Sequence, residues 1–252
     1  MKIIGIIPAR MASTRFPGKP LCKICGITMI EHVYKRSRMS RCLEEVYVAT
    51  CDTEIVKEVE RFGGKAVMTS ASHKTCSDRV AEACRIIKSD ADIIVNIQGD
   101  EPLVHPDMIE ESVLPFSKDP ELVCSNLIAQ IKDDEDFRNP NTIKVVKDQN
   151  DFALYFSREP IPSGKKFSGR YERYKQVCVI PFKRTFLLKY VAWKPTPLET
   201  VESIDMMRIL ENGYKVKLAK TAFDTMAVDN ELDRQKVEEL MASDQLFKKY
   251  RA

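Results

Sequence analysis

Several features that mark common classes of protein are missing from this chain of 252 residues. No apolar run approaches the roughly 18 residues that a membrane-spanning helix needs. The three histidines, His32, His73 and His105, lie far apart in the sequence, so they form no cluster typical of a zinc site. No G-x-G-x-x-G and no G-x-x-x-x-G-K-[ST] follows the first apolar segment, which disfavours a dinucleotide-binding fold and a P-loop ATPase.

An excess of one charge is missing too, with 40 basic and 37 acidic side chains and a formal net charge of +3. So small an excess does not mark a nucleic-acid-binding protein, and we expect neither a nucleic acid nor a membrane as a partner. The N-terminus has no signal-peptide pattern. Eight scattered cysteines in a chain without a leader are typical of reduced thiols, which favours a cytoplasmic location.

What is present begins with an alternation of strand-like and helix-like segments. We expect strands over 2–8, 46–50, 65–68 and 93–97, and helices over 28–40, 54–62 and 80–88. This order predicts an α/β fold with a mostly parallel sheet built from right-handed crossovers. Such sheets bind ligands at the carboxyl ends of their strands, where the loop after the first strand would lie.

The second half of the chain adds further elements. We expect strands over 122–131, 143–147, 152–157 and 215–219, and helices from 106, from 197 to about 210, and over 231–240. The charged stretch 133–140 is expected to be irregular. In the helix that begins at 197, the spacing predicts that Leu198, Val201 and Ile204 face the core. Thr53 and Ser77 are the expected N-caps of two earlier helices.

Three cations, Arg10, Arg15 and Lys19, lie close together in the loop after the first strand. The residues between them are mostly small, so the backbone can approach a ligand. Arginine offers a planar fork of donors and lysine a mobile point charge, a combination that suits a polyphosphate. On residue types alone, a plain basic surface loop explains the pattern equally well.

A carboxylate follows the strand over 93–97, in the stretch Gln98-Gly99-Asp100. Gly99 lets the backbone bend sharply there. Because Asp100 would lie at the carboxyl edge of the sheet, it could hold Mg²⁺ against phosphate groups. The ordinary alternative for such an aspartate is a turn or cap residue.

The order of these residues carries a resemblance. IIPARMASTRFPGKPL resembles the first signature of the 3-deoxy-manno-octulosonate (Kdo) cytidylyltransferase family, and QGDEP resembles its second. ALYFSREPIP is similar to a third family segment, and the resemblance extends from Lys2 to about Leu240. It implies one Rossmann-like nucleotidyltransferase domain over 1–252, with a small antiparallel insertion at about 130–182 for acceptor binding and dimerisation.

The resemblance also implies an activity and its residues. A family member transfers CMP from CTP to the hydroxyl of a Kdo-like sugar acid with Mg²⁺, as a homodimer, for lipopolysaccharide or capsule biosynthesis. The implied catalytic residues are Arg15, Lys19 and Asp100, and the implied metal ligands are Asp100 and Asp229. The implied nucleotide-binding residues are Pro8, Ala9, Arg10, Ser13, Arg15, Lys19, Thr75, Ser77, Asp78 and Arg79. The implied acceptor-binding residues are Gln98, Arg158, Gln176, Glu202 and Asp205.

Several positions depart from the family pattern. The nucleotide segment has Cys76 in place of a glycine, and such a change would penalise a positive φ. Asn230 replaces a threonine after Asp229, whose ordinary interpretation is a helix cap. Four pocket positions differ as well, namely Gln176, Cys178, Ile180 and Met206. The acceptor therefore stays open among Kdo, an amino-modified octulosonate, a sialic-type acid, and a phosphate or phosphonate acid. A nucleotide-binding protein without catalysis is the second alternative.

Overall fold

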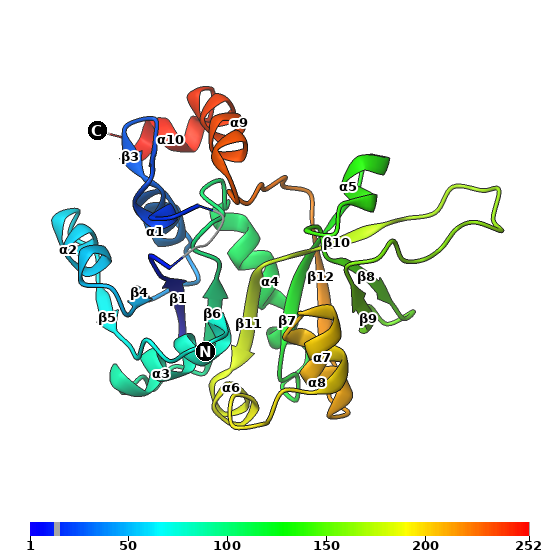
Figure 1. Ribbon diagram of the computed structural model, residues 1–252. Coiled ribbons are helices and arrows are strands. Elements are labelled where there is room, and N and C mark those ends of the chain that lie inside the picture. The colour runs from blue at the N-terminus through cyan, green and yellow to red at the C-terminus, as the bar shows by residue number, and fades with distance from the viewer. Residues whose placement is uncertain (13–15, 252) are drawn as a thin grey trace. The chain divides into compact units, whose positions relative to one another are not determined.

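The computed structural model describes residues 1–12 and 16–251. The chain forms two compact units, the first made of residues 1–110 with 224–252 and the second of residues 111–223. Within the described part of the chain, every helix is too short or too polar to span a bilayer. All eight cysteines are free thiols, as their scatter predicts. Figure 1 shows the elements of both units along the chain.

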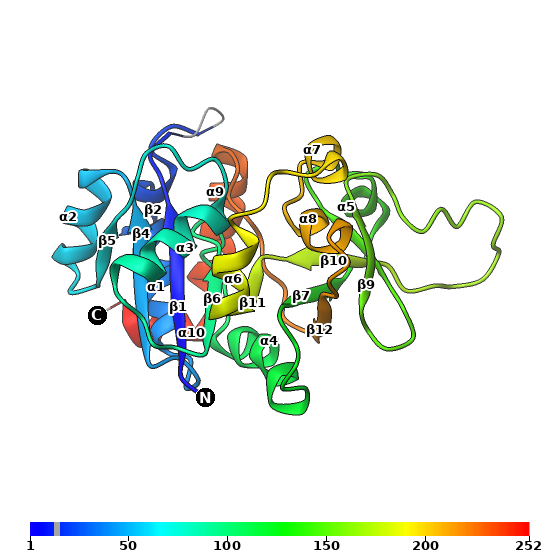
Figure 2. The ribbon, with the colours of Figure 1, turned by 90° about the horizontal axis from the view of Figure 1, so that it is seen from below.

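The first unit is built on parallel strands in the order β6-β1-β4-β5, which confirms the parallel sheet expected from the sequence. The strands are β1 (Ile3–Ala9), β4 (Glu45–Thr50), β5 (Ala66–Met68) and β6 (Ile93–Ile97). Every residue of β1 is buried, because β1 lies in the middle of a sheet whose two faces are covered. Figure 2 shows β1 between β4 and β6.

Helices cover both faces of this sheet. They are α1 (Met29–Arg38), α2 (Thr53–Arg61), α3 (Cys76–Ile86) and the start of α4 (Pro106–Lys118). Figures 1 and 2 show α1 and α3 on opposite faces. These helices match the expected ranges to within a few residues, because their apolar positions recur with helical spacing.

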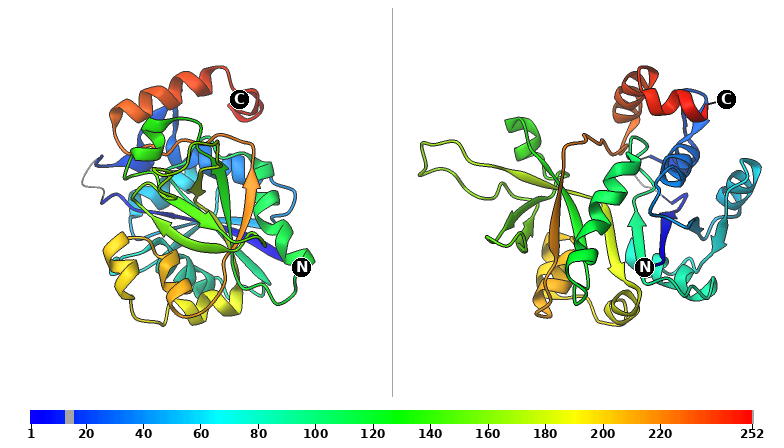
Figure 3. Two further views of the ribbon diagram at one scale, coloured as in Figure 1. Left: turned by 90° about the vertical axis from the view of Figure 1, so that its right-hand side faces the viewer. Right: turned by 180° about the vertical axis from the view of Figure 1, so that it is seen from behind.

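The C-terminal segment returns to the first unit as α9 (Glu231–Ala242) and α10 (Gln245–Tyr250). It packs near a short 3₁₀ turn, η1 (Lys19–Leu21), and a hairpin of β2 (Lys23–Ile24) and β3 (Ile27–Thr28). Figure 3 shows both C-terminal helices beside this early part of the chain. One apolar cluster joins the two regions, with Ile24 and Met29 on one side and Val237 and Phe247 on the other.

The second unit contains the expected antiparallel sheet. Its strand order is β12 (Lys217–Thr221), β7 (Ser125–Gln130), β10 (Tyr174–Val177), β8 (Lys144–Lys147) and β9 (Ala153–Ser157). Only the pair of β12 with β7 is parallel. Beside them lie β11 (Val179–Lys183) and the helices α5 (Asp134–Arg138), α6 (Arg184–Tyr190), α7 (Pro197–Glu202) and α8 (Met206–Glu211). The unit is longer than the insertion expected at about 130–182.

Two local predictions in this unit are wrong. The stretch 133–140 is not irregular, because Asp133 caps a short helix, α5, by accepting a hydrogen bond from the Asp136 backbone N–H (2.7 Å). The helix that begins at 197 is not continuous, because Ser203 adopts a left-handed conformation with φ of 56° and separates α7 from α8.

This break changes which side chains of 197–210 face inward. Ile204 is buried as expected, but Leu198 and Val201 are exposed, Val201 to 81%. The inward position in α7 is taken by Glu199, whose carboxylate pairs with the buried guanidinium of Arg208 at 2.5 and 2.7 Å. An apolar pattern with a helical period therefore gave the wrong face once the helix was interrupted.

A buried histidine links α1 to the end of the chain. His32 Nε2 lies 2.8 Å from the Ile24 carbonyl oxygen, and Nδ1 lies 2.8 Å from the Tyr250 hydroxyl. Because a carbonyl only accepts, Nε2 donates to Ile24 and Nδ1 accepts from Tyr250. Burial lowers the pKa of His32 to about 4, with the nearby positive charge of Arg36 acting in the same direction.

We predict that this histidine makes the fold sensitive to mild acid. In the unfolded chain His32 has its ordinary pKa near 6.5 and binds more protons than in the folded protein, so stability is complete above that pH and falls as the pH drops toward about 4. The loss between pH 7.5 and pH 4.5 is on the order of 2 kcal/mol. Urea unfolding at both pH values would measure it. The His32→Gln variant should lack this part of the change in unfolding free energy with pH. An equal change in the two proteins would contradict the prediction.

Candidate active site

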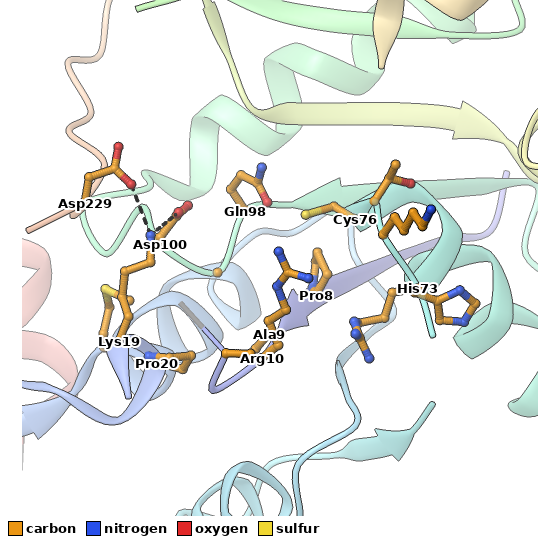
Figure 4. Close-up of a pocket in the computed structure, with 16 residues that line it drawn as sticks. Pro8, Ala9, Arg10, Lys19, Pro20, His73, Cys76, Gln98, Asp100 and Asp229 are labelled. Carbon is orange, nitrogen blue, oxygen red and sulfur yellow. Dashed lines mark hydrogen bonds and ion pairs between the residues drawn. The ribbon is translucent and has the colours of Figure 1, made fainter. Parts of the chain in front are cut away.

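A cavity of about 310 Å³ lies at the carboxyl ends of β1 and β6, where the parallel sheet predicts a ligand site (Figure 4). Nine of the predicted site residues line it: Pro8, Ala9, Arg10, Lys19, Thr75, Arg79, Gln98, Asp100 and Asp229. Ser77 and Asp78 do not line it. Ser13 and Arg15 lie outside the described residues, so their predicted roles stay predictions.

At one end of the cavity the ammonium group of Lys19 lies between two carboxylates. Lys19 Nζ is 2.7 Å from Asp100 Oδ2 and 3.3 Å from Asp229 Oδ1 (Figure 4). Burial alone would lower the pKa of Lys19, but the charges and hydrogen bonds of Asp100 and then Asp229 raise it above its ordinary value. Three residues from distant parts of the sequence thus form one charged cluster.

The loop that carries Asp100 packs closely on the end of β1. A Cβ atom added to Gly99 would lie 2.7 Å from the Pro8 carbonyl oxygen, a separation at which the backbone would have to shift. Gly99 does not have a positive φ, so this close approach explains the glycine rather than the sharp bend expected from the sequence. The Val228 backbone N–H donates to the Asp100 carbonyl (2.9 Å), which joins the loop to the segment that carries Asp229.

Asp229 is not the cap of the last long helix. Asn230 has that role, since its side chain accepts a hydrogen bond from the Asp233 backbone N–H (3.0 Å) at the start of α9. The Asp233 carboxylate in turn accepts from the Asp229 backbone N–H (3.0 Å). The asparagine that departs from the family pattern therefore supplies the cap, and the Asp229 carboxylate points toward Lys19.

The wall formed by the start of α3 is arranged differently from the sequence expectation. Thr75, not Ser77, is the N-cap of α3, and it accepts from the Asp78 backbone N–H (3.2 Å). Cys76 is the first residue of the helix and is not among the residues with positive φ. The expected strain from replacing a glycine at this position is therefore absent.

Arg79 is buried and stabilises the start of α3 through hydrogen bonds. Its guanidinium donates to the Thr69 hydroxyl (2.6 Å) and the Ser70 carbonyl (3.3 Å), while the side chain still lines the cavity. These bonds connect α3 to the loop that follows β5. Arg79 thus has a structural role, and its contact with a nucleotide stays a prediction.

The predicted site residues did not include seven of the residues that line the cavity: Ala12, Pro20, Met29, His73, Lys74, Cys76 and Gly99. His73 and Lys74 line the cavity, and His73 Nε2 lies 2.5 Å from Glu82 Oε2. Both belong to the same family segment as Asp78, so that segment could have indicated them. Asp52, which is not among the residues that line the cavity, was not predicted either: its carboxylate accepts from the Met11 backbone N–H (2.7 Å) and makes no capping hydrogen bond to α2. Asp52 is the N-cap residue of α2, in place of the expected Thr53.

The second unit holds most of the predicted acceptor residues. Gln176 Nε2 donates to Asn126 Oδ1 (2.5 Å), and the fully buried Asn126 donates to the carbonyls of Leu127 (2.7 Å) and Val177 (2.9 Å). Asn126 therefore fixes the orientation of the Gln176 amide. No local pattern indicates this partner of Gln176, because Asn126 lies fifty positions away.

Arg158 and Glu202 lie together in the second unit. The Glu202 carboxylate accepts from the Ser157 hydroxyl (3.0 Å) and from the Arg158 backbone N–H (2.9 Å). The Arg158 guanidinium donates to the carbonyls of Pro140 (2.8 Å), Glu202 (2.8 Å) and Ser203 (3.1 Å). These bonds hold α7 against the end of β9. Asp205 begins α8 as its N-cap residue.

Asp100 and Asp229 are the residues whose chemistry suits a divalent cation. Among residues 1–12 and 16–251, no group of three or more histidine, cysteine, aspartate and glutamate side chains could hold a metal ion. Mg²⁺ does not need such a group, because it is commonly bound by one or two carboxylates together with substrate phosphates and water. Two carboxylates that already share one ammonium ion fit that mode.

Comparisons with known proteins show the family of this chain. A family model described as Cytidylyltransferase matches residues 4–221. The 3-deoxy-manno-octulosonate cytidylyltransferase of Geobacter metallireducens is 44% identical over 256 residues, covering 98% of this chain and 100% of that protein. The protein of the same name from Fusobacterium nucleatum is 44% identical over 237 residues, covering 94% of this chain and 96% of its own.

Solved structures show the same likeness. A structure of CMP:2-keto-3-deoxy-manno-octonic acid synthetase complexed with CTP is 37% identical, with a TM-score of 0.90, covering 96% of this chain and 99% of that one. A putative glucose-1-phosphate thymidylyltransferase from Bacillus anthracis shares the fold at 15% identity, with a TM-score of 0.69 and 96% of each chain covered.

We predict that Gly99→Ala destabilises the first unit. The new methyl group would overlap the Pro8 carbonyl, so the loop or β1 must move, at a cost of about 1–3 kcal/mol. Urea unfolding measures the loss. Gly169→Ala is the matched control, because its methyl group would meet only the ring of the exposed Phe167, which can turn away. Equal stabilities for the two variants would contradict the close-approach explanation.

Proposed function

Because the chain belongs to the family of 3-deoxy-manno-octulosonate cytidylyltransferases, we propose that it transfers CMP from CTP to the hydroxyl of Kdo or a closely similar sugar acid. The observation that carries this proposal is the meeting of Lys19, Asp100 and Asp229 at one cavity. Relatives that cover nearly the whole chain and bear that enzyme's name support it.

The proposed reaction is a single in-line displacement. The acceptor hydroxyl oxygen attacks the α-phosphorus of CTP and forms a new phosphorus–oxygen bond. The bond from the α-phosphorus to the oxygen that bridges to the β-phosphate breaks, pyrophosphate leaves with that electron pair, and the hydroxyl proton passes to solvent. The protein's contribution to such a transfer is positioning and charge stabilisation.

The first unit supplies the groups proposed for CTP. Arg10, Thr75 and Arg79 line the cavity and would hold the cytidine part, with Pro8 and Ala9 forming its floor. Lys19 would neutralise the leaving pyrophosphate together with Arg15. Ser13 is proposed as a further nucleotide contact. Ser77 and Asp78 would act through the start of α3, because the Asp78 backbone N–H completes the Thr75 cap.

Asp100 and Asp229 are proposed to hold Mg²⁺. When bound, the ion would lower the pKa of the acceptor hydroxyl and screen the phosphate charges. The ammonium group of Lys19 lies 2.7 Å from Asp100 and would be free to move toward the phosphates once the carboxylates held a cation. Lys19 would then neutralise the carboxylates before binding and the leaving group afterwards.

Gln98 lines the cavity of the first unit, and we propose that it contacts the acceptor. In the second unit, Gln176 and Arg158 are proposed to contact the acceptor's hydroxyls and carboxylate, and Glu202 and Asp205 are proposed as further acceptor-binding residues. The hydrogen bonds of Asn126 and Glu202 support preformed orientations for these two side chains. We further propose that the second unit's sheet mediates a homodimer and that the enzyme works in the cytoplasm, where its free cysteines stay reduced.

We predict that Asp100→Asn abolishes turnover while CTP binding survives. Removing one metal carboxylate should lower kcat roughly a thousandfold, equivalent to about 4 kcal/mol of transition-state stabilisation. Pyrophosphate release measures the rate, and calorimetry with CTP measures binding. Asp107→Asn, on the exposed first turn of α4, is the control and should behave as the parent protein. Normal turnover in Asp100→Asn would rule out the metal role.

An acceptor panel tests the other half of the proposal. Pyrophosphate release from CTP should be fastest with Kdo, because the relatives that cover the chain carry that activity in their names. The panel should include an amino-modified octulosonate, a sialic-type acid and a phosphonate acid, since Gln176 and Met206 depart from the family pattern. A faster rate with one of these acids would identify that acid as the acceptor in place of Kdo. Tight CTP binding with no turnover on any acid would contradict the proposed activity.

A further inference from the structure

Arg36, a residue outside the cavity, bonds to the loop that carries Asp100 and to α10, which lies downstream of Asp229. Arg36 lies on α1, and its side chain is only 1% exposed. Its guanidinium donates to the Asp244 carboxylate (2.5 Å), to the Tyr250 hydroxyl (2.9 Å) and to the Leu103 carbonyl (3.5 Å). One buried cation thus bonds to two different segments of the first unit.

The first of these segments carries Asp100. Leu103 lies three residues after Asp100, in a tight turn closed by a hydrogen bond from the Val104 backbone N–H to the Glu101 carbonyl (3.0 Å). The Glu101 side chain also accepts from the Thr225 hydroxyl (3.0 Å). The bond from Arg36 therefore supports this loop at Leu103, a residue that does not line the cavity.

The second segment is α10, which follows Asp229 and α9 in the chain. Asp244 caps α10 by accepting from the backbone N–H groups of Leu246 (2.6 Å) and Phe247 (3.3 Å), so its bond to Arg36 ties the whole helix to α1. Phe247 and Tyr250 share an apolar cluster with Val228, the residue that directly precedes Asp229. A shift of α10 would be transmitted through this packing to the Asp229 backbone.

We propose that Arg36, together with the Tyr250 hydroxyl that it contacts, is a positioning residue that sets the separation of the Asp100 and Asp229 carboxylates for a divalent cation. The inference rests on the metal pair of the proposed function. Stability alone gives no reason for this arrangement, because a buried ion pair can often be replaced by apolar side chains without loss of stability. The planar guanidinium fixes the direction of each bond, which a lysine ammonium does not.

Two conservative variants test the inference. Arg36→Lys keeps the charge but loses the planar fork, and Tyr250→Phe removes only the hydroxyl. Mn²⁺ binding to the CTP-bound protein, followed by electron paramagnetic resonance, should weaken roughly tenfold in Arg36→Lys and less in Tyr250→Phe, as for other residues that orient metal ligands. CTP affinity in the presence of a chelator should be unchanged, because the cavity wall from β1 and α3 is untouched.

Tyr34→Phe is the matched control. Tyr34 lies on the same helix and is 8% exposed, and its hydroxyl accepts a single hydrogen bond from the Lys65 backbone N–H (3.1 Å). This variant should lose stability as Tyr250→Phe does, yet bind Mn²⁺ like the parent protein. In an Asp229→Asn background, Arg36→Lys should weaken Mn²⁺ binding less than it does in the parent protein, because one of the two carboxylates whose separation it sets is already gone.

Three results would overturn the inference. The first is parental Mn²⁺ affinity in folded Tyr250→Phe, which also decides the question if Arg36→Lys does not fold. The second is an equal loss in Tyr34→Phe, and the third is an undiminished effect of Arg36→Lys in the Asp229→Asn background. A parent that binds Mn²⁺ with this pattern but transfers CMP to no acid would contradict the proposed function and leave the inference standing.

Discussion

The arrangement of the first unit depends on neutralising two carboxylates of like charge beside one cavity. Asp100 and Asp229 would repel each other at this separation if no cation lay between them. Lys19 provides that cation in the structure, at 2.7 Å and 3.3 Å. The same charge requirement makes the pair suitable for Mg²⁺, so one electrostatic constraint accounts for the ligand-free geometry and for the proposed chemistry.

The backbone around this cluster is arranged to bring its members together. β1 and β6 are neighbouring parallel strands, so the loops after them leave the sheet at the same edge. Gly99 permits the loop after β6 to contact the end of β1, because any side chain would collide with the Pro8 carbonyl. The C-terminal segment then returns and is joined to the Asp100 loop by the hydrogen bond from Val228. Each step relies on backbone geometry more than on side-chain packing.

Charged residues in the second unit show how structural and functional roles overlap. Glu199 pairs with Arg208 across the break at Ser203, which explains a buried acid without invoking a ligand. Glu202 and Arg158 fasten α7 to β9, although both resemble acceptor-binding residues of the family. Their hydrogen bonds are compatible with either role, because a side chain held in one orientation is also a better binding group. The family resemblance thus indicates a binding role for Glu202 and Arg158, and their contacts show a structural role for the same residues.

The sequence by itself determined the parallel strands, most helices and the cationic loop, because these follow from local patterns of apolar residues and from short motifs. It could not show that Asn230 rather than Asp229 caps α9, that Asn126 orients Gln176, or that Arg36 joins two segments. The tertiary structure decided these points, since each depends on which backbone groups already have partners and on contacts between residues up to 214 positions apart. Local periodicity carries no information about such distant pairs. The inward face of 197–210 was predicted wrongly for a local reason: the left-handed residue Ser203 ends α7, so the helical spacing does not continue into α8.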